Sequence, residues 1–195
     1  TLFAYMVEGQ GSRDFKHAKE LMYRHPTLTH RLLKLLADGI VDYLTAQMES
    51  GADLVQLFDT WGGLLRPIDY EEFSLYYVNY IIERLPANRG PVILFSKGVH
   101  HSYRALADSG ADVIGVDWTA NLGAVRAEVE QRVAIQGNLD PTLLLAPKER
   151  IRSETKRLLG EYGSEPGHVV NLGHGILKET DPENAKAFVE AVKGA

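Results

Sequence analysis

The sequence predicts an α/β protein with a parallel sheet, because short apolar runs alternate with helical patterns along the chain. Five runs rich in β-branched residues predict buried strands: Leu54–Phe58, Val92–Phe95, Val113–Val116, Val133–Gln136 and Val169–Leu172. Polar loops follow most of these runs, and no Gly-x-Gly-x-x-Gly motif follows any of them. A (β/α)8 barrel is therefore favoured over an open doubly wound sheet, whose nucleotide-binding turn concentrates its glycines.

Helical patterns occupy the intervals between the predicted strands. The stretch Thr27–Ser50 predicts one long helix, and Gly51 predicts its C-cap. Asp181 before Pro182 predicts the N-cap of the last helix. The other predicted helices are Tyr70–Leu85, Ser102–Asp108, Leu122–Gln131, Pro147–Tyr162 and Glu183–Val192.

Five strand–helix units do not close a barrel of eight. We therefore expect residues 1–195 to be the C-terminal part of a single barrel domain that contains the last five units. The N-terminal part, with the missing strands, is expected upstream of Thr1. A chain of 195 residues suits one domain better than two.

Composition excludes several classes of function. The net charge of −5 gives no basic surface for nucleic acid, and no apolar run approaches the roughly 20 residues of a membrane span. The absence of cysteine excludes disulfides, thiolate nucleophiles and cysteine-rich metal sites. A cytoplasmic location is the default expectation.

Five motifs follow one another in an order and spacing that resemble the uroporphyrinogen decarboxylase family. They are Tyr5–Gly9 (YMVEG), Gln56–Gly63 (QLFDTWGG), Gly115–Trp118 (GVDW), Gln136–Pro141 (QGNLDP) and Asn171–Ile176 (NLGHGI). The resemblance covers essentially the whole chain. Lys178 and Tyr76 stand where proline is usual or common in the family, and both lie outside the matching site residues.

This resemblance implies a barrel enzyme of porphyrin and heme biosynthesis that acts as a homodimer without metal or organic cofactor. Its reaction would convert the four acetate side chains of uroporphyrinogen III to methyl groups, giving coproporphyrinogen III. The pyrrole ring can act as the electron sink that a cofactor usually supplies. The family's central Asp and its key Arg residues lie in the N-terminal segment, so the catalytic residues are expected upstream of Thr1.

The resemblance also implies three substrate-binding residues. Tyr5 matches a tyrosine whose hydroxyl binds a substrate carboxylate or orders the central Asp. Thr60 follows a predicted strand where family members carry Ser or Thr, and His174 lies between two glycines after the last predicted strand. On residue type alone, each of the three would more often be an ordinary loop residue.

Other polar residues are expected to be structural. Asp59, Asp117 and Asp140 follow strands and are expected to tie loops and helix starts through backbone N–H groups. His100 and His101 are adjacent, and adjacent side chains rarely point at one metal ion, so we expect an ordinary loop there.

Two other classes of function remain open. Corrinoid-dependent methyltransferases have a related barrel and hold zinc through His and Cys, and the lack of cysteine argues against them. A half-barrel could also serve as a binding or scaffold module without catalysis.

Overall fold

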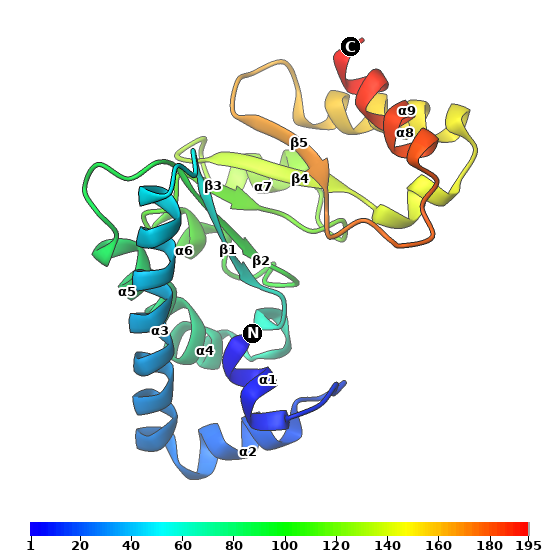
Figure 1. Cartoon of the computed structure of the whole chain (residues 1–195). Helices are drawn as coiled ribbons and strands as arrows, with labels where there is room; N and C mark the ends of the chain where they lie inside the picture. Colours follow the sequence, from blue (N-terminus) through cyan, green and yellow to red (C-terminus); the bar gives the residue numbers. More distant parts are fainter. Residues whose placement is uncertain (195) are drawn as a thin grey trace. The chain divides into compact units, whose positions relative to one another are not determined.

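The computed structural model describes residues 1–194, and Ala195 lies outside the described part. The chain forms two compact units, residues 1–112 and residues from Val113 onward (Figure 1). Whether they belong to the single barrel domain that the sequence predicts over 1–195 stays a prediction. Within residues 1–194, no helix combines the length and the apolar character that crossing a membrane requires.

The first unit is built on two parallel strands, β1 (Val55–Asp59) and β2 (Val92–Ser96). They pair in register, with Val55 opposite Val92 and Asp59 opposite Ser96. Every residue of β2 is buried, as its continuous apolar run predicts. Strand β1 alternates instead, and Phe58 is 63% exposed at a position where its ring meets the edge of Phe95.

Helices of the first unit surround these strands. The long α3 covers Pro26–Glu49 and ends before Gly51, whose N–H bonds the carbonyl of Met48. Figure 1 shows α3 alongside α5, with α1 and α2 near its N-terminal end. The helices and helical turns of this unit are α1 (Leu2–Glu8), α2 (Lys16–Arg24), α3, the 3-10 turn η1 (Gly62–Leu64), α4 (Pro67–Tyr70), the π turn η2 (Glu71–Leu75), α5 (Tyr76–Arg84) and α6 (Tyr103–Ala107).

Helices α1 and α2 were not expected from the sequence. Both are short and are held by one apolar cluster, which gathers side chains from α1, α2 and η2. The buried members of that cluster are Phe3, Phe15, Ala18, Met22 and Phe73. Phe15 precedes α2 in a left-handed conformation, at φ 48°. Tertiary packing therefore stabilises helices whose length alone would leave them marginal.

The second unit contains three parallel strands, β3 (Val113–Gly115), β4 (Ala134–Leu139) and β5 (His168–Leu172). Strand β4 pairs with both neighbours, so each strand lies beside the one that follows it in the chain. Helices α8 (Lys148–Tyr162) and α9 (Pro182–Lys193) pack side by side (Figure 1).

Local signals for helix ends in this unit are confirmed, with one correction. Asp181 Oδ1 accepts the N–H of Glu183 at 2.9 Å and caps α9 as predicted. Helix α7 (Leu122–Glu128) ends three residues before the predicted Gln131, because Glu130 and Gln131 have positive φ. Strand β4 extends three residues beyond its predicted end at Gln136. The prediction ended there because the Gly-Asn pair that follows resembles a turn in sequence.

Candidate functional site

The loop after β1 is folded tightly by two glycines. The N–H of Gly63 bonds the carbonyl of Lys97 at 3.0 Å, next to the end of β2. A Cβ on Gly63 would lie 2.5 Å from that carbonyl, and one on Gly62 would lie 2.7 Å from Asp59 Oδ2. Half-buried Thr60 is therefore held on a loop whose backbone has little freedom.

Asp59 is buried directly before Thr60 and has a structural role. Its carboxylate accepts the Ser74 hydroxyl at 2.5 Å and the Thr1 hydroxyl at 3.0 Å. The sequence predicts backbone N–H partners for Asp59, so the role is as expected but the partners differ. These partners are distant from Asp59 in the sequence, so local sequence patterns do not predict them.

Tyr5 lies on α1 with 48% of its side chain exposed. Its ring meets Trp61 nearly edge to face, with centroids 6.3 Å apart and planes at 83°. Because Trp61 follows Thr60 directly, the structure brings Tyr5 to the loop that carries Thr60. Two of the three predicted binding residues thus belong to one neighbourhood of the first unit.

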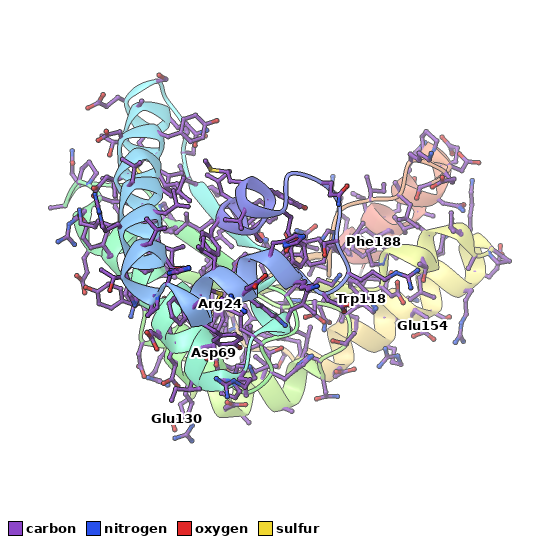
Figure 2. All side chains as sticks on the ribbon, turned by 90° about the horizontal axis from the view of Figure 1, so that it is seen from below. Arg24, Asp69, Trp118, Glu130, Glu154 and Phe188 are labelled. Carbon is purple, nitrogen blue, oxygen red and sulfur yellow. The ribbon has the colours of Figure 1, made fainter. Side chains whose placement is uncertain are left out.

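A polar clamp fixes the same loop region to α2. Arg66 donates two hydrogen bonds to the Asp69 carboxylate, at 2.7 and 2.9 Å, and the Tyr23 hydroxyl donates a third at 2.8 Å. The Arg66 guanidinium, aided by Tyr23, holds the pKa of the buried Asp69 carboxyl below its usual value. Figure 2 shows Asp69 near Arg24, where α2 ends. Lys19 completes the clamp by donating to the Leu64 carbonyl at 2.7 Å.

The second unit holds His174, the third predicted binding residue, on the loop after β5. The exposed imidazole meets the indole of Trp118, labelled in Figure 2, at 6.2 Å and 87°. Gly173 makes this approach possible, since a Cβ there would lie 2.4 Å from the backbone nitrogen of Trp118. The N–H of Gly173 also bonds the Leu139 carbonyl at 2.7 Å, at the end of β4.

Asn138 builds the loop that carries Trp118, a role that sequence reasoning missed. Its buried amide nitrogen donates to the carbonyls of Asp117 and Ala120, both at 2.8 Å. Asp117 itself accepts the N–H of Thr119 at 2.8 Å. Asn138 lies two residues beyond the predicted strand end, in a stretch expected to be loop, so its burial and its need for partners were not apparent from the sequence.

The expected cap at Asp140 is confirmed, and the adjacent histidines have partners close by in the chain. Asp140 caps the following turn by accepting the N–H and the hydroxyl of Thr142, at 2.8 and 2.7 Å. The rings of His100 and His101 each contact a nearby side chain of the same segment, Tyr103 and Ser102. Over the described part of the chain, no three His, Asp or Glu side chains gather as a metal site would require.

The order of elements, with a polar loop after most strands, defines the class as a βα-barrel protein. A solved methyltransferase from Methanosarcina mazei has the same fold, with a TM-score of 0.82 over 98% of this chain and 62% of that chain. At 21% identity this likeness shows the fold alone. The chain therefore has the fold of the C-terminal part of a (β/α)8 barrel, as the sequence predicts.

The chain belongs to the uroporphyrinogen decarboxylase (URO-D) family, whose model matches residues 1–195. Two curated relatives named uroporphyrinogen decarboxylase are 52% identical (Chromohalobacter salexigens) and 50% identical (Cellvibrio japonicus). Each alignment covers 98% of this chain, but only 56% and 55% of the relatives. The chain thus spans little more than half the length of these proteins.

Proposed function

We propose that this chain is the C-terminal part of an enzyme that decarboxylates the four acetate side chains of uroporphyrinogen III, giving coproporphyrinogen III. The observation that carries the proposal is the family match over the whole chain, together with relatives of that name at about half identity. The proposal includes a homodimer in the cytoplasm and no metal or organic cofactor.

The proposed reaction begins with protonation of a pyrrole ring carbon next to the acetate arm. The ring then carries positive charge, so the carbon–carboxylate bond can break, releasing CO2 and returning its electron pair to the ring. A second proton enters at the exocyclic methylene carbon while the ring carbon loses its own. Each acetate thereby takes up one net proton and becomes a methyl group, and no redox partner is needed.

Tyr5, Thr60 and His174 are the proposed recognition groups for the carboxylates of the substrate. Hydroxyl and imidazole N–H groups can donate to carboxylates, and all three lie on or beside loops after strands. The positive charge on the ring requires a fixed anion. Asp59, Asp117 and Asp140 are engaged in holding loops, so they do not suit that task. We therefore assign the anion and the substrate-binding arginines to a segment upstream of Thr1.

The decisive experiment measures coproporphyrinogen formation by chromatography in the presence of a chelator. Three samples are compared: this chain, the N-terminal segment of the Chromohalobacter salexigens relative, and both together, mixed or fused. The fused protein is called the completed chain below. We expect no product above the buffer rate from either part, and turnover from the combination.

Two results would count against the proposal. Product from this chain alone would show that one of its own carboxylates is catalytic. A completed chain that is inactive and holds one tightly bound zinc ion would favour methyltransferase chemistry, the class named for the structural neighbour.

A further inference from the structure

Three aromatic rings from separate segments form a closed cluster beside the predicted binding residues. The ring of Trp61 lies 4.8 Å from that of Phe15 and 6.3 Å from that of Tyr5. The rings of Tyr5 and Phe15 are 6.4 Å apart, which closes the triangle. The cluster therefore joins α1, the start of α2 and the loop after β1.

Trp61 is the rigid member of this cluster. Its backbone lies between Asp59 and the two close-packed glycines, and the turn after it is closed by a bond from the Leu64 N–H to the Trp61 carbonyl at 3.1 Å. Tyr5 has less support of its own, because it is half exposed on a seven-residue helix whose one buried residue is Phe3. The direction of the Tyr5 side chain thus depends on its contact with the Trp61 ring.

We propose that Trp61 is a positioning residue, which holds the Tyr5 hydroxyl in a fixed relation to Thr60 for binding a substrate carboxylate. This inference rests on the proposed function for the recognition roles of Tyr5 and Thr60. One indole both follows Thr60 in the chain and contacts the Tyr5 ring, so the two donors keep one geometry. Preorganised donors bind a ligand more tightly because less freedom is lost on binding.

The chain offers a clean conservative variant for this residue. The Nε1 atom of Trp61 is buried and has no hydrogen-bond partner among residues 1–194. Trp61→Phe therefore removes no such hydrogen bond and keeps an aromatic face, whereas Trp61→Leu removes the ring contact with Tyr5. Tyr43→Leu, at a 63% exposed position on α3, is the matched control for losing an aromatic ring elsewhere.

The first measurement is a kinetic cycle in the completed chain. Trp61→Leu should raise KM for uroporphyrinogen about 2- to 12-fold, the range that one aromatic pair supports, with kcat little changed. Trp61→Phe should restore most of the affinity. In a Tyr5→Phe background, Trp61→Leu should have almost no further effect, because the hydroxyl that it positions is gone. Additive effects of the two substitutions, or a fall in kcat at unchanged KM, would overturn the proposal.

The second measurement is independent of activity. With 3-fluorotyrosine placed at position 5 of the completed chain, Trp61→Leu should shift and broaden the 19F resonance, and Tyr43→Leu should leave it in place. A resonance that does not respond to Trp61→Leu would overturn the positioning role even in an active enzyme. An inactive completed chain whose resonance does respond would refute the proposed function and leave the positioning role supported.

Discussion

The imidazole of His174 stands nearly perpendicular to the indole of Trp118, with ring centroids 6.2 Å apart. The arrangement resembles that of Tyr5 on Trp61, with planes at 83°. The two tryptophans of the chain thus each contact a residue that the family resemblance assigns to substrate binding. Edge-to-face contact of this kind favours one relative orientation of the two rings.

Replacing His174 by Asn should weaken substrate binding more than it slows saturated turnover. The inferred role is one charge-assisted hydrogen bond to a carboxylate, whose loss costs about 1.5–3 kcal/mol, so KM should rise by roughly 10- to 150-fold. Steady-state kinetics of the completed chain measure this, with His100→Asn on another loop as the control. A large fall in kcat at unchanged KM would contradict the binding role.

Replacing Asn138 by Leu should destabilise the second unit and loosen the loop that holds Trp118. The substitution leaves the carbonyls of Asp117 and Ala120 without their shared donor, and an unmet buried polar group costs about 1–3 kcal/mol. In a Trp61→Phe background, Trp118 is the one tryptophan of residues 1–195, so its fluorescence reports the loop.

We expect that emission to shift to longer wavelength in Asn138→Leu as water reaches the indole. The exposed Asn88→Leu serves as the control and should leave the emission unchanged. An Asn138→Leu variant with unchanged emission and unchanged denaturant midpoint would show that the amide does not hold this loop.

Adding one methyl group at two glycines should have opposite effects on stability. In Gly63→Ala the new Cβ meets the Lys97 carbonyl at 2.5 Å, so backbone must move, at a cost of about 1–3 kcal/mol. In Gly160→Ala, inside α8, the Cβ meets no atom within 4 Å, and better helix propensity should stabilise by about 0.5–1 kcal/mol. Urea unfolding of both variants in the completed chain measures the two changes in unfolding free energy, which should have opposite signs. Equal changes in unfolding free energy would show that the backbone of the loop after β1 can move to accommodate the new methyl group at little cost.

Acidification should weaken the second unit through His168. Burial lowers the pKa of this imidazole below 6.5, although its hydrogen bond to the Gly137 carbonyl at 2.7 Å acts in the opposite direction. A depressed pKa in the folded state means that the unfolded chain binds the proton first. The contribution of His168 is therefore full above pH 6.5 and is lost as the pH falls through the lowered value.

We expect the unfolding free energy of the completed chain to fall between neutral pH and pH 5. His168→Gln should flatten this fall, and His17→Gln, at an exposed position, should leave it unchanged. If His17→Gln flattened the profile as much as His168→Gln, the acid sensitivity would lie elsewhere.

Much of the architecture follows from local sequence. All five strands lie where apolar, β-branched runs stand between polar or Gly-containing segments, because such runs are stable only when buried in a sheet. The Asp181–Pro182 pair starts α9 and Asp140 caps its turn, since a cap acts on backbone atoms two or three residues away. The motif residues Tyr5, Thr60 and His174 were likewise named from the chain alone.

What only the tertiary structure decided is how those residues are held. The contact of Tyr5 with Trp61 joins residues 56 positions apart in the numbering, and that of Trp118 with His174 also spans 56. Helix α1 and the partners of Asp59 likewise depend on segments remote in sequence. Periodicity and capping describe interactions within a few residues, whereas side-chain packing is set when distant segments exclude water together. The sequence by itself thus determined the strands, the helices between and after them, and the candidate residues. The packing of distant segments decided the helices α1 and α2 and the neighbours that orient the candidate residues.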